Sequence, residues 1–539
     1  MAEVQEQISA QSLRWGWLER FSSQRSRLAV LALLTALVLS IYALVNHALG
    51  FPLDDAWIHQ DFARTLAQSG RFAYAPDRSG AGSTSPLWVL LLAPAQLIPS
   101  APLWLVVLWA NTLGALALFG LAWATGALVE RWLAEMDSRV RAAASLLAGC
   151  AVITEWHLTW ASLSGMETLL FVFLSMLLLL GVGRGWHAAW LGVLAAGLTC
   201  TRPEGAVLAF LVAIALLLKA QPATQRKGQR WYNLLLYLGV SMLGLVPLLA
   251  LNEVASGHLL PSTFYAKGAY YALGGSELER LAGYGLGVLQ FLWSSPPVVL
   301  GLPGAGYLLW QERRAWRDST IWLALMWGVA LIGVYAVHLP VVYQNGRYLM
   351  PVLPVLLALG IVGWLRLLKA RRYALLPIAL LALGLGLGLL SVGRGAGIYA
   401  ANVRYINEYQ VATALWLRAH TPLGALVATH DIGAIGYFSD RHVIDLGGLT
   451  QPEIVPLLSD QRALVAYLKQ QRVEYVVMFP DWFPSPHLLL LAVQQGEVYR
   501  AHDPVIAAIG GSDLVTYQTG WGVPAALSDH VRRSQPGRR

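Results

Sequence analysis

The chain has 539 residues, of which 56% are hydrophobic and only 13% are charged. A soluble globular domain carries about 25% charged residues, so this composition excludes an ordinary soluble protein and predicts a polytopic membrane protein. The net charge of +8 does not indicate a nucleic-acid partner, because much of the Lys and Arg lies in short loops between apolar runs, where it orients a membrane protein. The two cysteines, Cys150 and Cys200, lie in or beside apolar runs and do not suggest a secreted disulfide framework.

The first predicted element is a polar N-terminal segment, 1–27, which we expect in the cytoplasm. A first span, 28–50, follows, and then a charged segment rich in Gly, Ser and Pro, 51–86, which we expect to be the first extracytoplasmic loop. The next apolar run, 87–100, is short and is broken by two prolines. About 14 helical residues reach only about 21 Å, against a hydrocarbon core of about 30 Å. We therefore expect a juxtamembrane or re-entrant helix there.

Further apolar runs predict more spans, about eleven in all with the first. The most basic short loops, 219–230, 311–317 and 366–372, are expected in the cytoplasm, which places the C-terminal domain outside. One alternative stays open: 188–218 is a single long helix if 87–100 spans instead. The further runs are 103–127, 142–159, 167–183, 188–200, 203–218, 232–251, 286–310, 318–338, 347–365 and 374–392.

The composition shifts near Ser391, so 28–392 is predicted to be the transmembrane domain and 393–528 an extracytoplasmic α/β domain. Strand-like and helix-like segments alternate in this second domain. The basic tail, 529–539, is expected to be disordered. The expected strands are 425–429, 442–445 and 474–479, and the expected helices are 399–420, 461–471 and 487–495.

Two adjacent acids, Asp54 and Asp55, follow the first span directly. An ionised carboxylate at the membrane surface is costly unless it has partners, so both are candidate functional residues. The spacing equally allows Asp54 to cap the following helix and Asp55 to complement its dipole. His59 lies on the same helical face as Asp55 and can orient a carboxylate, share a metal or face water. Asp61 and Arg64 are expected to be solvated.

Further polar residues fall on the same predicted side of the membrane as the paired acids. A lysine or arginine among them can hold a phosphate by charge-assisted hydrogen bonds. Each residue alone is better explained as an interfacial group or a helix-end partner, but several of them on one side, together with paired acids, favour a site. These residues are Glu167, Arg202, Glu204, Lys267, Arg347 and Tyr348. The C-terminal domain, with His430-Asp431 and Asp445–Gly448, is interpreted as acceptor-binding or structural.

Several motifs, in their order along the chain, resemble those of GT-C type glycosyltransferases. The nearest in pattern are the bacterial relatives of actinobacterial cell-wall arabinofuranosyltransferases, and more distantly the dolichyl-phosphate-mannose protein mannosyltransferases. The motifs are LDDAWI (53–58), TSPLW (84–88), SGMETLLF (164–171), TRPEG (201–205), PSTFYAKG (261–268), NGRYLMPVLP (345–354) and HDIGAIGYFSDRHVIDLGGL (430–449).

The resemblance implies a polytopic α-helical GT-C protein of the inner (plasma) membrane. It implies a polyprenyl-phosphate-linked sugar as donor, a glycan, lipid or protein acceptor outside the cytoplasm, and inversion at the anomeric carbon. An aspartate of the first loop is the general base in such enzymes, which here is Asp54 or Asp55. No cofactor is expected to be required, although these acids and His59 leave room for a divalent metal. Trp57 and His59 depart from the family pattern, which leaves the donor sugar open.

A transporter or flippase of lipid-linked sugars is the alternative function. It would share the many spans, the interfacial acids and the basic contacts to phosphate. The spans show no evident inverted repeat, and the polar clusters gather on one side of the membrane rather than near its midplane. Both observations favour the transferase.

Overall fold

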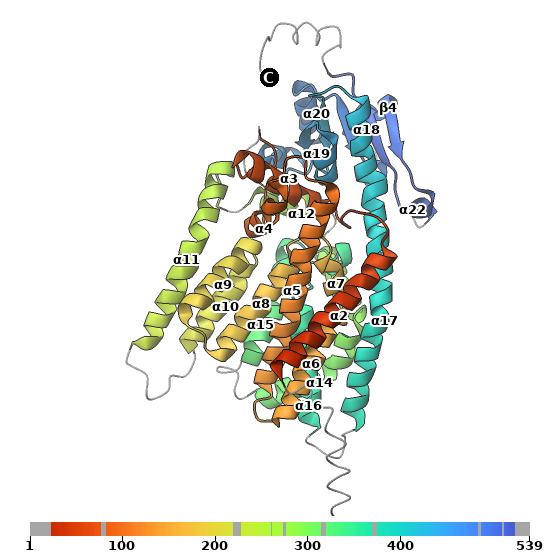
Figure 1. Ribbon diagram of the computed structural model, residues 1–539. Helices are drawn as coiled ribbons and strands as arrows, with labels where there is room; N and C mark the ends of the chain where they lie inside the picture. The colour runs from red at the N-terminus through yellow and green to blue at the C-terminus, as the bar shows by residue number, and fades with distance from the viewer. Residues whose placement is uncertain are drawn as a thin grey trace, which may run out of the picture.

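The computed structural model describes residues 23–76, 82–218, 228–259, 261–272, 276–313, 320–368, 375–482, 487–508 and 511–522. The predicted cytoplasmic segment 1–27 lies outside the described residues except for 23–27, and the tail 529–539 lies outside them entirely. The described chain forms a bundle of helices with a smaller α/β part at one end, the upper end in Figure 1.

Long apolar helices form the frame of the bundle. Among the described residues, five helices are long and apolar enough to cross a membrane, and a bent pair makes a possible sixth span. Their outer faces carry exposed leucines, such as Leu243 and Leu390, which are 73% and 75% exposed. Apolar faces of this extent suit contact with lipid. The five candidate spans lie in α2 (Gln24–Val45), α5 (Leu103–Trp132), α11 (Gln229–Ser256), α15 (Thr320–His338) and α17 (Leu375–Ile406).

Shorter helices fill the bundle between these long ones. The predicted juxtamembrane helix is α4, whose 11 residues span about 17 Å and so fall short of the hydrocarbon core. The remaining short helices are α6 (Ser138–Thr154), α7 (Trp156–Ser162), α8 (Thr168–Arg184), α9 (Ala188–Thr201), α10 (Gly205–Leu218), α13 (Glu277–Trp293), α14 (Pro296–Glu312) and α16 (Val352–Leu367), and α4 itself is Pro86–Gln96.

Two predicted apolar runs are interrupted by proline. The run 188–218 is two helices, α9 and α10, which lie side by side, because Pro203 breaks the helix between them. The run 286–310 differs from the expected span, since α13 and α14 meet at an angle of 100°. Pro296 occupies the first turn of α14 and follows Ser295, whose backbone is not helical. Proline starts a helix readily but cannot continue one.

Close glycine contacts hold α14 against α16. A Cβ atom on Gly363 would lie 1.8 Å from the carbonyl oxygen of Gly304, and one on Gly360 would lie 2.7 Å from the Cα of Gly301. Small residues at such spacing let two membrane helices approach closely. This contact fixes α16, which begins just after Arg347 and Tyr348.

The upper part of the molecule is built from the first loop and the C-terminal domain. The first loop contributes α3 (Asp55–Ser69), and a later connection contributes α12 (Ser262–Ala272). The C-terminal sheet has the order β2-β1-β3-β5-β4, with β1 parallel to β2 and β3, and β5 antiparallel to β3 and β4. Its strands are β1 (Leu426–Thr429), β2 (His442–Asp445), β3 (Tyr475–Met478), β4 (Glu497–Ala501) and β5 (Leu514–Gln518).

The helices of the C-terminal domain continue directly from the membrane bundle. α17 runs without a break past residue 392, and one π-helical turn, Asn407–Val411, joins it to α18 (Ala412–His420). The helix expected to begin at 399 is therefore the upper half of a longer rod, which crosses the composition shift near Ser391 (Figure 1). The other helices are α19 (Gly433–Ser439), α20 (Gln461–Gln470), α21 (Leu488–Val493) and α22 (Pro504–Ala508).

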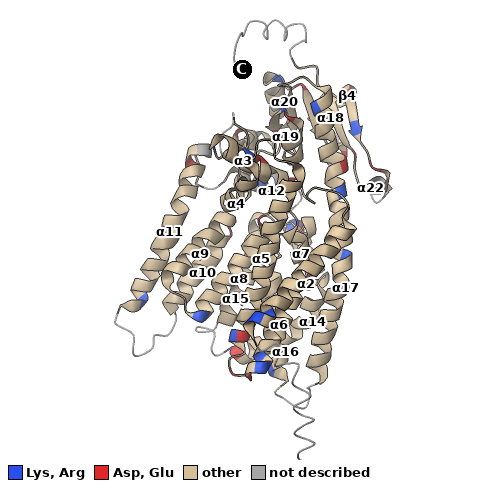
Figure 2. Cartoon of the chain, in the orientation of Figure 1, with Lys and Arg blue, Asp and Glu red and all other residues tan. Residues whose placement is uncertain are grey.

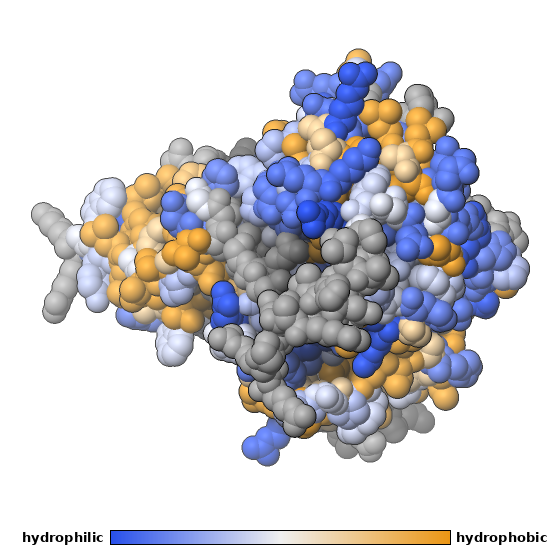
Figure 3. All heavy atoms as spheres, turned by 90° about the horizontal axis from the view of Figure 1, so that it is seen from above, coloured by the Kyte–Doolittle hydropathy of each residue, from blue (hydrophilic) through white to orange (hydrophobic). Residues whose placement is uncertain are grey.

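Charge and hydropathy divide the molecule along its long axis. Lys and Arg gather with some Asp and Glu at the lower end of the bundle. The helices between the two ends carry few charged residues (Figure 2). The helix ends that flank the three predicted cytoplasmic loops lie at this lower end (Figure 1). From above, hydrophilic side chains dominate around the C-terminal domain, and hydrophobic ones gather on the side of α11 (Figure 3).

Candidate active site

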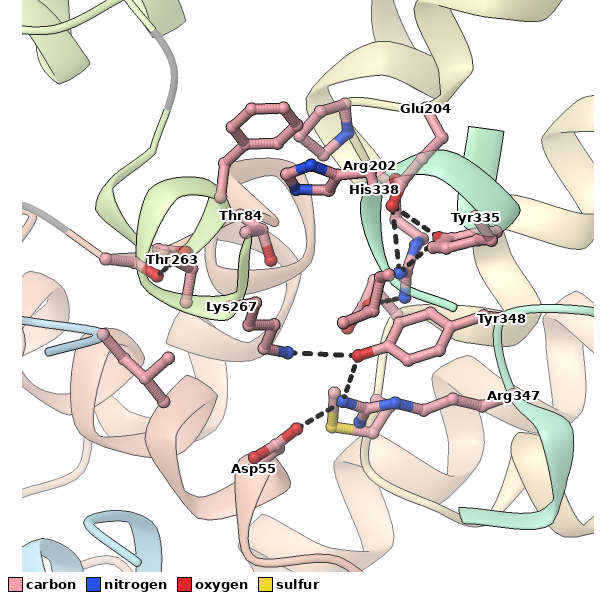
Figure 4. A pocket seen from close by; sticks show the side chains of 18 of the residues that line it. Asp55, Thr84, Arg202, Glu204, Thr263, Lys267, Tyr335, His338, Arg347 and Tyr348 are labelled. Atoms are coloured by element: carbon pink, nitrogen blue, oxygen red, sulfur yellow. Dashed lines mark hydrogen bonds and ion pairs between the residues drawn. The ribbon is translucent and has the colours of Figure 1, made fainter. Parts of the chain in front are cut away.

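A cavity of about 280 Å³ lies among the upper ends of the bundle helices, beneath α3 and α12 (Figure 4). Every predicted site residue except Asp54 lines it. The cavity has a polar side and a more apolar wall, which includes Val207, Phe264, Val334 and Leu339. The lining residues from the prediction are Asp55, His59, Glu167, Arg202, Glu204, Lys267, Arg347 and Tyr348.

An unusual turn presents Arg347 to this cavity. Gln344, Asn345 and Gly346 all have left-handed backbones, with φ of 53°, 57° and 68°. Only glycine adopts this conformation without cost, and asparagine tolerates it better than most residues. The amide of Asn345 donates to Oδ1 of Asn402 in α17 over 3.2 Å. The turn therefore holds its shape through a contact with the rod helix and aims the next two residues inward.

The polar side of the cavity is centred on Arg347. Its Nη2 donates to Oδ2 of Asp55 over 2.5 Å and to the hydroxyl of Tyr348 over 3.0 Å. Nζ of Lys267 donates to the same hydroxyl over 3.1 Å. Arg347 is only 2% exposed, yet within the described chain its Nε and Nη1 atoms have no hydrogen-bond partner. Two cations, Arg347 and Lys267, therefore line one small space, which suits an anion with several oxygens.

The same cations shift the ionisation of their neighbours. Burial raises the pKa of Asp55, but Arg347 and Lys267 outweigh it and hold that pKa below its usual value. Burial likewise raises the pKa of Tyr348, but Arg347, Lys267 and Arg202 lower it to about 7. Asp55, whose side chain is 27% exposed, is therefore an anion at neutral pH and is open to the cavity.

A second polar cluster lines the cavity beside α10 and α15. Nη1 of Arg202 donates to Glu167 over 2.7 Å, and its Nη2 donates to Tyr335 over 3.0 Å and to Glu204 over 3.4 Å. Nε2 of His59 lies 3.1 Å from Oε2 of Glu167. Arg202 is shared by both carboxylates, so the cluster presents hydroxyl and carboxylate oxygens to the cavity.

Asp54 points away from the cavity and contacts the C-terminal domain. Its two carboxylate oxygens accept from the backbone amides of Gly433 and Ala434, each over 2.8 Å. Asp54 stands at the N-cap of α3, but the capping bond that the spacing allowed is not formed, because its side chain instead binds the first turn of α19. Burial and the nearby Asp431 raise the pKa of Asp54.

Other first-loop residues also fasten the C-terminal domain. The expectation that Asp61 is solvated is wrong: it is 2% exposed, because α19 covers this part of α3. Asp61 pairs with Arg64 over 2.6 Å, and Arg64 donates to the carbonyl oxygen of Tyr437 over 3.0 Å. Trp57 is fully buried against the rings of Tyr437 and Phe438, at centroid distances of 5.0 and 4.7 Å. The departure from the family pattern at Trp57 thus serves domain packing.

The C-terminal domain also supplies part of the cavity wall. Leu449 lines the cavity, and its carbonyl oxygen accepts from the hydroxyl of Ser262 over 2.7 Å. Thr263 donates to the carbonyl oxygen of Gly82 in the first loop over 2.9 Å. Three segments distant in sequence therefore meet at one rim of the cavity.

Several cavity residues were not predicted as site residues, among them Phe264, Tyr335, His338 and Leu449. Tyr335 and His338 are one helical turn apart at the end of an apolar helix, so a polar pair at a predicted helix end is the signal that could have found them. Phe264 and His338 stack with centroids 3.8 Å apart. Nothing in the local sequence distinguishes Leu449, which reaches the cavity only through the fold of the C-terminal domain.

The donor set of the cavity gives no ready-made metal site. Asp55 is bound by Arg347 and His59 by Glu167. Across the described ranges, no three His, Cys, Asp or Glu side chains gather in a group that could hold a metal ion.

Residues 401–530 match a family model described as a domain of unknown function (DUF8728). No curated protein matches the sequence. Among solved structures, the fold is similar to that of two GT-C glycosyltransferases, and the chain therefore has the GT-C fold that the motifs predicted.

The first of these structures is ArnT from Cupriavidus metallidurans bound to undecaprenyl phosphate. It is 16% identical, the match covers 91% of this chain and 98% of ArnT, and the TM-score is 0.54. The second is the oligosaccharyltransferase AglB from Archaeoglobus fulgidus in complex with an inhibitory peptide and a dolichol-phosphate. It is 14% identical, with coverage of 93% of this chain and 74% of AglB and a TM-score of 0.53.

Proposed function

We propose that this protein is a membrane glycosyltransferase that moves a sugar from a polyprenyl-phosphate donor to an acceptor hydroxyl, with Asp55 as the general base. The observation that carries the proposal is the juxtaposition of an ionised Asp55 with Lys267 and the incompletely bonded Arg347 in one cavity. The ArnT and AglB structures hold an undecaprenyl phosphate and a dolichol-phosphate, which supports a donor of that class here.

The phosphate of the donor would bind Arg347 and Lys267, because charge-assisted bonds from a guanidinium and an ammonium suit phosphate oxygens. The apolar wall, with Val207, Val334 and Phe264, would take the first part of the prenyl chain. The cluster around Arg202 would face the sugar, whose hydroxyl groups pair well with carboxylate and phenol oxygens.

In the reaction, the Asp55 carboxylate accepts the proton of the acceptor hydroxyl as its oxygen attacks the anomeric carbon. The bond from that carbon to the phosphate oxygen breaks, and its electron pair stays with the polyprenyl phosphate that leaves. Arg347 and Lys267 stabilise the charge that develops on this phosphate. A single displacement inverts the anomeric carbon, and Asp55 then returns its proton to water.

The charge distribution supports an assignment of the side of the membrane. The helix ends that flank the three basic loops lie at the lower end, and the cavity lies at the upper end. Lys and Arg in short loops stay in the cytoplasm, so the cavity and the C-terminal domain would face the extracytoplasmic side of the inner membrane. The acceptor would be a glycan, lipid or protein on that side.

The test is turnover of a lipid-linked sugar by the purified protein in detergent, with Asp55→Asn and Asp54→Asn compared. Asp55→Asn should reduce transfer by about 10²-fold or more, the usual effect of losing a general base. Asp54→Asn should lower the midpoint of thermal unfolding and cost less activity, because Asp54 binds backbone amides outside the cavity. Transfer by Asp55→Asn within about tenfold of wild type would remove Asp55 as the base. A flippase, the alternative function, would consume no donor in this assay.

A further inference from the structure

Asp55 depends on the same arginine that the donor phosphate needs. In the part of the chain that the structure describes, Arg347 is the only cation that forms a salt bridge with Asp55, through Nη2 at 2.5 Å. Lys267 contributes attraction at longer range, as does His59. The free enzyme therefore holds the acid in an ion pair with a buried guanidinium, where one carboxylate oxygen is already occupied.

Because of the geometry of the guanidinium, Asp55 and the donor phosphate compete for Nη2 of Arg347. A bidentate contact with phosphate uses either the Nε and Nη2 edge or the Nη1 and Nη2 edge, so both edges include Nη2. Nη2 carries two hydrogens, and Asp55 and the hydroxyl of Tyr348 accept from it. Any bidentate phosphate contact must therefore displace one of these two groups. Nε and Nη1 are enclosed and have no hydrogen-bond partner within the described chain, so either can become the second donor when the guanidinium turns toward the phosphate.

The charges decide which group leaves. The Asp55 carboxylate and an incoming phosphate repel each other, whereas the hydroxyl of Tyr348 can turn its proton toward a phosphate oxygen. Lys267, which already donates to Tyr348 over 3.1 Å, can follow that hydroxyl onto the phosphate. Asp55 is the group that has to give up Arg347.

We propose that the Asp55–Arg347 ion pair is a latch that the donor phosphate opens: Arg347 transfers from Asp55 to the phosphate, and the released carboxylate becomes free to accept a proton from the acceptor. This inference rests on the proposed function. It implies ordered binding, because the acceptor meets a free carboxylate only after the donor has bound.

The latch is tested by binding of undecaprenyl phosphate alone to the full-length protein in detergent, without any reaction. Arg347→Gln should weaken binding. Asp55→Asn, the variant that is expected to reduce turnover, should tighten it on the order of tenfold, a usual size for coupling between two sites, because phosphate then no longer competes with a carboxylate. Asp55→Ala carries the same expectation and guards against a failure of the Asn variant to fold.

Two controls separate the latch from general charge repulsion. Glu204→Gln removes a carboxylate charge from the same cavity without touching Arg347, and it should tighten binding clearly less than Asp55→Asn. In an Arg347→Gln background, Asp55→Asn should change affinity by less than about twofold, since the partner it releases is gone.

Two results would overturn the latch while leaving the proposed function in place. One is unchanged or weaker phosphate binding by Asp55→Asn. The other is equal tightening in both backgrounds, or by Glu204→Gln, which would mean simple repulsion. Failure of the wild-type protein itself to bind undecaprenyl phosphate would overturn the proposed function, and the latch with it.

Discussion

Tyr348 is the residue whose ionisation responds most directly to the cations of the cavity. Its hydroxyl accepts from Arg347 and Lys267, and its ring lies 4.9 Å from the guanidinium carbon of Arg202. A phenol usually ionises near pH 10, but these cations lower the pKa of Tyr348 to about 7 against the effect of burial. The side chain is a hydrogen-bond donor below that pH and an added anion above it.

Binding of undecaprenyl phosphate should therefore weaken as the pH rises through about 7. Below this pH the neutral hydroxyl donates to phosphate, and above it the phenolate neutralises Arg347 and Lys267 and repels the ligand. Tyr348→Phe removes the titrating group and should flatten this decline, while the titration of the ligand itself is common to both proteins. Parallel binding curves for the two proteins from about pH 6 to about pH 9 would contradict this role for Tyr348.

At the scale of the elements, the first turn of α19 packs directly on the start of α3. A Cβ atom on Gly433 would lie 2.0 Å from the backbone carbonyl oxygen of Asp54. That oxygen belongs to the backbone and cannot swing aside, so any side chain at this position must separate the two helices. The C-terminal domain thus holds Asp54, and through it the start of the helix that carries Asp55.

Gly433→Ala should lower the midpoint of thermal unfolding by several degrees, in line with about 1–3 kcal/mol for overpacking. It should also reduce transfer, because Asp55 shifts with the start of α3. Gly397→Ala is the matched control, since that position in α17 has no atom of the described chain within 4 Å of the added Cβ. Equal unfolding midpoints and turnover for the two variants would show that this contact does not position Asp55.

The elements differ in how far the sequence alone predicts them. Long apolar runs and β1 to β3 were predictable, because hydrophobic spacing and β-branched residues report local structure directly. The bend between α13 and α14 was missed because the run 286–310 is apolar on both sides of its prolines. β4 was missed because it is mostly exposed and carries polar residues. β5 is buried and its sequence, LVTYQ, has a strand-like pattern that sequence reasoning overlooked.

The residues of the cavity also differ in how far the sequence alone predicts them. Charged residues inside apolar sequence need partners, which is why Glu167, Arg202 and Arg347 stand out in the sequence alone. The separate roles of Asp54 and Asp55 were not predictable, since the partners of Asp54 lie 379 and 380 residues further along the chain. Adjacent residues of one type point in different directions, and only the fold decides which one meets the cavity.

On the scale of the whole molecule, the basic helix ends and the cavity lie at opposite ends of the bundle. Gln68 is exposed at the end of α3, and Ser138 is exposed at the start of α6. In a protein with Cys150→Ser and Cys200→Ser, a membrane-impermeant thiol reagent added to intact cells should label Gln68→Cys. It should reach Ser138→Cys only after the cells are opened. The reverse pattern would place the cavity in the cytoplasm.

The rod formed by α17 also sets how the two halves of the molecule face each other. A helix advances by about 100° and 1.5 Å for each residue, and α17 passes from the bundle to the C-terminal domain without a break. The angle of that domain around the rod is therefore fixed by the number of residues between the two. One residue inserted into α17 would turn the amides of Gly433 and Ala434 well away from Asp54. A substitution at an exposed position of α17 would leave them in place. In α17, the number of residues therefore sets the orientation of the C-terminal domain, and the identity of an exposed residue does not.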